Sequence, residues 1–178
     1  MKTFYISDEV KYATAEKFYE FCNEIDEEEA CVTVTSTGGN MWAATAIVSI
    51  MEDTQIKWIT YCPAIAMSAG LHIVAHGNER WASKNAMFMY HDGWESYSGS
   101  MDKIKEQINN KGFNMRSFDK SFAKRTGQTV SFWEQKIETL TREFYFTAAT
   151  AKRLGVIDKI GCPLLTLEEV ARRKENKV

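Results

Sequence analysis

The sequence predicts an α/β protein built around a largely parallel sheet with helices on its faces. Strand-like and helix-like segments alternate along the first half of the chain, which is the order that produces parallel sheets. Small and polar residues follow two of these strands, at the carboxyl ends where such sheets bind ligands. The 178 residues are 44% hydrophobic and 26% charged, an ordinary balance for one soluble domain with a substantial core.

Hydrophobic periodicity and turn residues place the individual elements. We expect strands at 3–6, 31–35, 57–62, 86–90 and 156–157, and an aromatic segment of unassigned structure at 144–146. We expect helices at 13–25, 41–51, 101–125, 131–140 and 148–154, and another that runs from the Ser68 turn to about residue 75. The whole chain, 1–178, is expected to form a single domain, with a projecting helical arm at about 93–125 and a charged tail at 166–178.

The predicted arm is polar, with one apolar residue every four or five. A helix of this composition either finds its burial in a partner subunit or lies as an amphipathic helix on the surface of its own domain. The sequence leaves both interpretations open.

Composition excludes several classes of protein. A formal net charge of −2 gives no sign of a nucleic-acid or anionic-membrane surface. No apolar run approaches the ~18 residues of a membrane span, and Asp8 and Glu9 follow the start too soon for a signal peptide. The four cysteines are scattered, as in a cytoplasmic protein with reduced thiols. We therefore expect a cytoplasmic protein with no nucleic-acid or membrane partner.

Ser68 lies where a strand-like segment passes into a helix, within IAMSAG at 65–70. A hydroxyl at such a turn is next to unpaired backbone N–H groups and the positive end of the helix dipole. Acyl chemistry places a nucleophile there, because the same amides can hold the oxyanion that forms. The alternative is that these residues are small only so that a helix can pack tightly on a sheet. Gly38 and Gly39 also follow a strand, so the two loops could meet over one reactive atom.

A Ser–His mechanism has three histidines to draw on, His72, His76 and His91. His91 follows an apolar strand, in the right place to reach a serine on the neighbouring unit. His72 and His76 share a helix face at a spacing that could hold a metal, but Ile73 stands where zinc peptidases have their glutamate base. We expect structural roles for this pair and no metal site.

Taken in order, these motifs resemble the proteolytic subunit of the Clp protease, a self-compartmentalising serine peptidase of the crotonase-like superfamily. The resemblance runs from residue 4 to about 160. The family's Ser-Pro-Gly-Gly loop is found here as STGG at 36–39, at the family's spacing from Ser68, and TGQ at 126–128 and the ending at 151–158 also match. The resemblance implies repeated ββα units of the crotonase type with a projecting handle helix.

The resemblance also implies roles for the loop residues. Ser68 is expected to be the nucleophile, and His91 the general base that later protonates the leaving amine. The backbone N–H groups of Gly39 and Ala69 are expected to form the oxyanion hole, with Gly38 in the supporting loop. No cofactor is implied.

The triad acid falls at Glu143, where the family usually has aspartate. Glutamate is one methylene longer but can still accept the imidazole N–H, and a glutamate in this context resembles the bacteriophage-borne branch of the family. The neighbouring Arg142 matches a family arginine that pairs with acids across the boundary between two rings. The resemblance thus implies a polypeptide substrate and a homo-oligomer of heptameric rings, stacked in pairs through the arm.

Two departures argue against the AAA+ unfoldase partner that the family implies. Few residues precede the first strand, where the family has a segment that forms axial loops. Cys31 and Thr33 occupy places where the family has aromatic residues that help dock the ATPase.

Three functions follow as hypotheses. The first is a serine endopeptidase that works inside an oligomeric chamber. The second is a crotonase-like acyl-CoA enzyme, which would use the paired amides on a thioester but has no need of a Ser–His pair. The third is an inactive structural subunit, which the altered acid would allow.

Overall fold

The computed structural model describes residues 1–91, 98–138 and 141–163. Its strands are β1 (Lys2–Ile6), β2 (Glu29–Val34), β3 (Lys57–Cys62), β4 (Ile65–Met67), β5 (Glu79–Ala82), β6 (Met87–His91), β7 (Glu143–Thr147) and β8 (Lys159–Ile160). Its helices are α1 (Tyr12–Asn23), α2 (Met41–Asp53), α3 (Ala69–Ala75), α4 (Met101–Thr126), α5 (Val130–Lys136) and α6 (Ala148–Arg153). The charged tail predicted at 166–178 lies outside the described residues.

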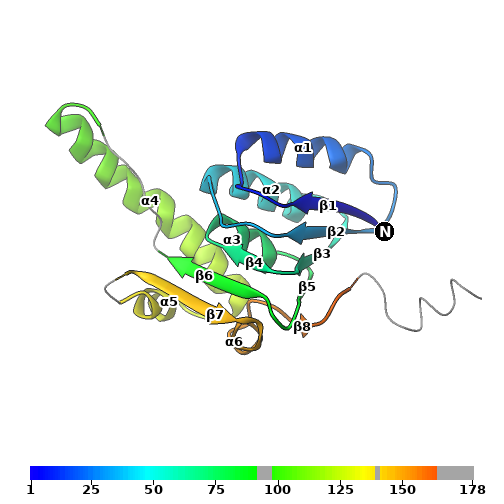
Figure 1. Ribbon diagram of the computed structural model, residues 1–178. Helices are drawn as coiled ribbons and strands as arrows, with labels where there is room; N and C mark the ends of the chain where they lie inside the picture. The colour runs from blue at the N-terminus through cyan, green and yellow to red at the C-terminus, as the bar shows by residue number, and fades with distance from the viewer. Residues whose placement is uncertain (92–97, 139–140, 164–178) are drawn as a thin grey trace, which may run out of the picture.

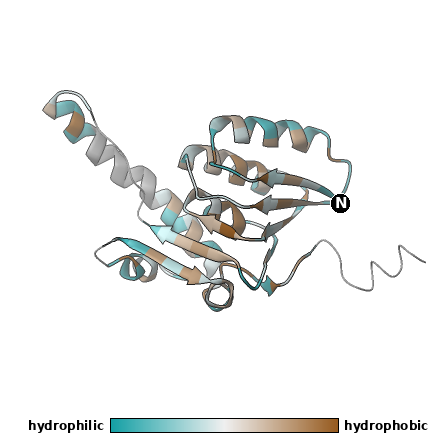
Figure 2. Cartoon of the chain, in the orientation of Figure 1, coloured by the Kyte–Doolittle hydropathy of each residue, from teal (hydrophilic) through white to brown (hydrophobic). Residues whose placement is uncertain are grey.

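The larger sheet has the strand order β1-β2-β3-β5-β8, and every neighbouring pair in it is parallel. The α/β fold class with a largely parallel sheet is therefore confirmed. The central strands β2 and β3 are mostly buried, as expected of parallel strands covered on both faces. Figure 1 shows α1 and α2 beside β1 and β2, and Figure 2 shows hydrophilic residues along the outer side of α1.

A second sheet, which the sequence did not reveal, has the order β4-β6-β7. β4 and β6 are parallel, whereas β6 and β7 are antiparallel. Ser68 therefore follows β4, and not the predicted strand at 57–62. The repeated strand–strand–helix pattern of β3, β4 and α3 agrees with the ββα units that the family resemblance implied.

The strand predicted at 156–157 is wrong. Val156 and Ile157 are buried apolar residues outside any strand, and β8 begins two residues later at Lys159. The apolar residues are buried as a strand would require, but they lie in a packed turn after α6 and do not pair with another strand.

β5 escaped prediction because it carries charged residues in the middle of the larger sheet. The Arg80 guanidinium is largely buried and forms an ion pair of 2.5 Å with Asp158, and it also donates to the carbonyl oxygens of Arg125 and Gly155. Burial of the Asp158 carboxylate would raise its pKa, but hydrogen bonds and charge from Arg80 outweigh burial and lower that pKa. A paired and hydrogen-bonded arginine is thus accommodated where an isolated charge would not be.

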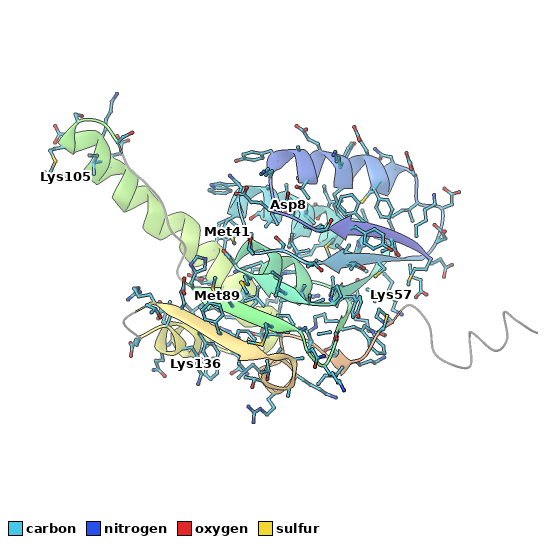
Figure 3. The ribbon with its side chains drawn as sticks, viewed as in Figure 1. Asp8, Met41, Lys57, Met89, Lys105 and Lys136 are labelled. Carbon is cyan, nitrogen blue, oxygen red and sulfur yellow. The ribbon has the colours of Figure 1, made fainter. Side chains whose placement is uncertain are left out.

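The arm predicted at about 93–125 is a single helix, α4, over its described part. Figure 1 shows its N-terminal half projecting from the body, and Figure 3 shows Lys105 near the free end. The other end is anchored by an aromatic cluster, in which the Phe122 ring lies 5.4 Å from that of Tyr90 and 4.8 Å from that of Trp133. None of the helices in the described ranges is long and apolar enough to cross a membrane.

Candidate active site

Ser68 occupies a strained turn between β4 and α3. Its backbone has φ 50° and ψ −120°, a conformation that side-chain-bearing residues rarely adopt. Its N–H donates to the carbonyl oxygen of Met89 on β6 at 2.9 Å, which ties the turn to the neighbouring strand. Strain of this kind costs about 1–3 kcal/mol and is concentrated at functional sites.

His91 is the last residue of β6, the strand that pairs with β4. Its Nε2 lies 2.7 Å from Ser68 Oγ, a short hydrogen-bond distance. The two residues come together because β4 and β6 are parallel neighbours with Met67 opposite Met89, so their carboxyl ends meet at one edge. An imidazole nitrogen at this distance from a serine hydroxyl is the geometry in which a base can accept the hydroxyl proton.

The loop after β2 approaches Ser68 more closely than any side chain would allow. Gly38 has φ 113°, and a β-carbon at this position would lie 2.7 Å from Ser68 Cβ. Gly39 has φ 138°, and a β-carbon there would lie 2.4 Å from the carbonyl oxygen of Val10. This geometry agrees with the expectation that the loop after β2 and the Ser68 turn lie together. Glycine permits the close approach because it has no side chain.

Gly39 belongs to the loop that approaches Ser68, and Ala69 directly follows Ser68 in the chain. Gly39 lies between Gly38, whose carbonyl accepts from Val10, and Asn40, whose N–H donates to Val10. Ala69 is the first residue of α3, where N–H groups have no partner within the helix. Neither the Gly39 N–H nor the Ala69 N–H donates to any residue in the described part of the chain. Both are thus available to an anion.

Glu143 lies directly opposite His91, as the first residue of β7 in the antiparallel β6–β7 register. Side chains that face each other in this way are within reach of one another. Its carboxylate accepts a hydrogen bond of 3.2 Å from the Tyr145 hydroxyl, which raises the pKa of Tyr145. Within residues 1–91, 98–138 and 141–163, no hydrogen bond joins Glu143 to His91. The structure thus places Glu143 opposite His91 without a hydrogen bond between their side chains.

Arg142 precedes Glu143 with φ 53°, a left-handed backbone conformation that is uncommon for arginine. The side chain just before the candidate acid is thus directed by an unusual turn. The predicted contact of Arg142 with another ring stays a prediction.

His72 and His76 are buried on α3. His76 is held by the His72 carbonyl oxygen at 2.6 Å and by Ser121 Oγ at 2.8 Å, which fits the structural role expected of it. No group of three metal-ligating side chains is present in the part of the chain that the structure describes. His72 differs from His76 because it lines a pocket beside Ser68 and His91.

The wall of this pocket was missed in the sequence analysis. Besides Ser68 and His91 it consists of Met41, His72, Tyr90, Phe118 and Asp119. Figure 3 shows Met41 near the anchored end of α4. The spacing of four residues between Ser68 and His72 could have indicated that both lie on one face of a helix. The contribution of α4 had no signal in the sequence.

Comparison with known proteins gives one family. The model of the Clp protease family matches residues 2–163 of this chain. The chain is also similar to ATP-dependent Clp protease proteolytic subunit 2 of Corynebacterium efficiens, with 26% identity over 157 residues that cover 87% of this chain and 77% of that protein. The resemblance noted in the sequence is thereby confirmed.

Proposed function

The chain belongs to the Clp protease family of serine peptidases, and from this premise we propose that it is an endopeptidase that cleaves peptides through an acyl-enzyme formed on Ser68. The observation that carries the proposal is the 2.7 Å contact between Ser68 Oγ and His91 Nε2 at a strained turn. A crotonase-like acyl-CoA enzyme has no need of this pair.

The proposed reaction begins when His91 accepts the hydroxyl proton and Ser68 Oγ attacks the peptide carbonyl carbon. The N–H groups of Gly39 and Ala69 donate to the oxyanion, and the loss of one such donor typically lowers the rate about a hundredfold to a thousandfold. His91 then gives its proton to the leaving amine, and water hydrolyses the acyl-enzyme by the same steps in reverse.

Glu143 is proposed to orient His91 by accepting a hydrogen bond from the other imidazole nitrogen, Nδ1. The two residues are directly opposite each other in the β6–β7 register, and the proposed bond requires the glutamate side chain to rotate away from Tyr145. The competing bond from the Tyr145 hydroxyl is exposed to solvent, and a hydrogen bond to a charged group contributes about 1.5–3 kcal/mol net. The proposed bond from the His91 imidazole to the same carboxylate is of the same charge-assisted kind.

A fluorophosphonate probe tests the proposed function. The probe reacts with an activated serine, so we expect labelling of one residue, Ser68, as located by peptide mass spectrometry. Labelling should be lost on denaturation, because it requires the His91 contact. An absence of labelling, with the protein folded, would contradict the peptidase and favour an acyl-CoA enzyme or an inactive subunit.

Glu143→Gln should lower the turnover number for a fluorogenic peptide by about 100-fold or more, because an amide can favour the wrong imidazole tautomer. The matched control is Tyr145→Phe, which removes only the hydroxyl that now holds Glu143. We expect activity within about threefold of wild type for this control, since Tyr145 is about half exposed at 51%. Full activity of Glu143→Gln would show that another acid holds the histidine.

The assembly is proposed to consist of two stacked heptameric rings, joined through α4, with the reaction in an enclosed chamber. The projecting half of α4 supports this arrangement, because helices in proteins gain most of their stability from packing. The described residues at its N-terminal end, from Met101 to Glu106, are mostly exposed. We propose a cytoplasmic protein and, since Cys31 and Thr33 are buried, no docking of an AAA+ unfoldase at these two side chains.

Arg142→Ala should abolish both ring stacking and peptidase activity, because the proposed contact of Arg142 lies next to Glu143 and would couple assembly to the alignment of the acid. Alanine keeps the β-carbon, so the substitution does not change the steric cost of the left-handed backbone at this position and removes only the rest of the arginine side chain. Arg153→Ala, which removes the same charge from an exposed site on α6, is the control and should change neither property. Analytical ultracentrifugation beside a peptidase assay measures both. A fully active monomer would contradict the chamber.

A further inference from the structure

His72 lies one helical turn beyond Ser68 on α3. Its backbone N–H donates to the carbonyl oxygen of Ser68 at 3.2 Å, and residues four apart share one face of a helix. Helical side chains lean toward the N-terminus of their helix, which for His72 is the direction of Ser68. This agrees with the presence of both residues in the wall of one pocket.

The His72 ring is buried, and its nitrogen atoms have no hydrogen-bond partner among the described residues. The side chain is 8% exposed and packs on Phe122 with ring centroids 4.8 Å apart. No residue within the described ranges is hydrogen-bonded to its ring nitrogens, in contrast to His76, which uses both. No described side-chain nitrogen or oxygen is at once fully enclosed and unpartnered. The His72 nitrogens therefore open onto the pocket.

Burial, together with the neighbouring imidazoles of His76 and His91, lowers the pKa of His72 to about 3. The ring is therefore neutral at physiological pH. A neutral imidazole has one donor and one acceptor nitrogen, so it can satisfy an uncharged polar group such as an amide.

The rest of the pocket combines apolar side chains with a second polar group, the Tyr90–Asp119 pair. Met41 and Phe118 supply apolar surface, while the Tyr90 hydroxyl donates to Asp119 at 3.0 Å. Ser68 and His91 also line this pocket. A peptide carbonyl attacked by Ser68 therefore lies beside the pocket, and the side chain of the residue that owns this carbonyl begins only two bonds from the carbonyl carbon.

We propose that His72 is a specificity-determining residue, which hydrogen-bonds an uncharged polar side chain, glutamine in the first instance, on the acyl side of the cleaved bond. This inference rests on the proposed peptidase function. An apolar side chain in the pocket would leave the imidazole desolvated and without a partner, whereas an amide would satisfy it, and sites built around such groups discriminate strongly against analogues that lack them.

The test uses three fluorogenic peptides that differ only at this residue, with glutamine, leucine or lysine. For the wild-type protein we expect kcat/KM to be about tenfold or more higher for glutamine than for leucine. His72→Phe, which keeps a ring against Phe122 but has no nitrogen, should lower the ratio of the two values at least tenfold. His72→Asn, which restores an amide, should recover part of the preference. Met101→Leu makes a mild apolar change at an exposed site outside the pocket, at the start of α4, and its ratio should stay within about twofold of wild type.

The rate of fluorophosphonate labelling at Ser68 separates this inference from the proposed function. Circular dichroism shows whether the His72 variants fold, and His72→Leu is the second variant should the phenylalanine variant not fold. An unchanged ratio in labelled variants would overturn the role of His72 and leave the peptidase standing. A wild-type preference for lysine that survives in His72→Phe would assign the selection to Asp119 instead. Failure of the wild type to label would overturn both.

Discussion

Ser68→Ala should lower peptide hydrolysis by about 10⁴-fold or more and abolish fluorophosphonate labelling, because it removes the atom that forms the acyl-enzyme. The fold should be unaffected, since alanine keeps the β-carbon that meets the Gly38 loop. A peptidase assay, probe labelling and circular dichroism measure the three properties. Residual activity within tenfold of wild type would contradict the assignment of the nucleophile.

The variant Ser68→Gly makes the same experiment report on strain. Both substitutions remove the hydroxyl and its bond to His91, but only glycine relieves the backbone conformation at φ 50°. The strain of about 1–3 kcal/mol is partly offset by the greater freedom of glycine in the unfolded chain, which costs about 0.4–1 kcal/mol. We expect Ser68→Gly to be about 1 kcal/mol more stable than Ser68→Ala in urea unfolding. Equal or lower stability would show that the turn is not strained by its side chain.

Gly39→Ala should destabilise the protein by about 3 kcal/mol or more and remove its activity. The new β-carbon would lie 2.4 Å from the Val10 carbonyl oxygen and 2.8 Å from the Val10 nitrogen, both backbone atoms that cannot turn aside. Relief requires that the loop move, which would displace the Gly39 N–H from the oxyanion hole proposed for it.

Gly127→Ala is the matched control for this change. Gly127 also has a positive φ, of 69°, but a β-carbon there would meet nothing within 4 Å. Gly127→Ala should lower the free energy of unfolding by about 1 kcal/mol, because only the positive φ is unfavourable for alanine. It should leave peptide hydrolysis unchanged. Thermal or urea unfolding measures the stability of Gly39→Ala and of Gly127→Ala. Similar losses of stability in the two variants would contradict the close approach at Gly39.

Local sequence patterns were sufficient for most of the larger sheet but not for the smaller one. The strand at 57–62 and the helix at 41–51 have clear hydrophobic patterns, and both are present as β3 and α2. β4 has three residues, too few for a period of two to be seen. β5 carries charges that are acceptable only because Asp158, far along the chain, receives Arg80. Its presence therefore depended on a tertiary contact that no local pattern contains.

The residues of the candidate site also differ in whether local sequence patterns could place them. Ser68 and His91 could be placed from the sequence because each follows a strand, and the carboxyl ends of parallel strands meet. Glu143 came only from the family resemblance, because its place opposite His91 depends on an antiparallel pairing between distant segments. The sequence predicts a structural role for His72, and only the folded structure shows that its ring nitrogens have no hydrogen-bond partner among the described residues.

The pairing of β6 with β7 fixes the positions of His91 and Glu143 independently of the chain segment that connects these two strands. His91 ends β6 and Glu143 begins β7, in direct register, although residues 92–142 intervene in the sequence. Doubling the length of a flexible connection costs only about 0.6 kcal/mol in closure entropy, and the aromatic anchor of α4 begins well behind its free end. A change of length in this segment therefore leaves the register of His91 and Glu143 intact. Since the outer part of α4 is also where the two rings are proposed to meet, the fold lets the contact between rings vary while the strand pair keeps these two residues opposite each other.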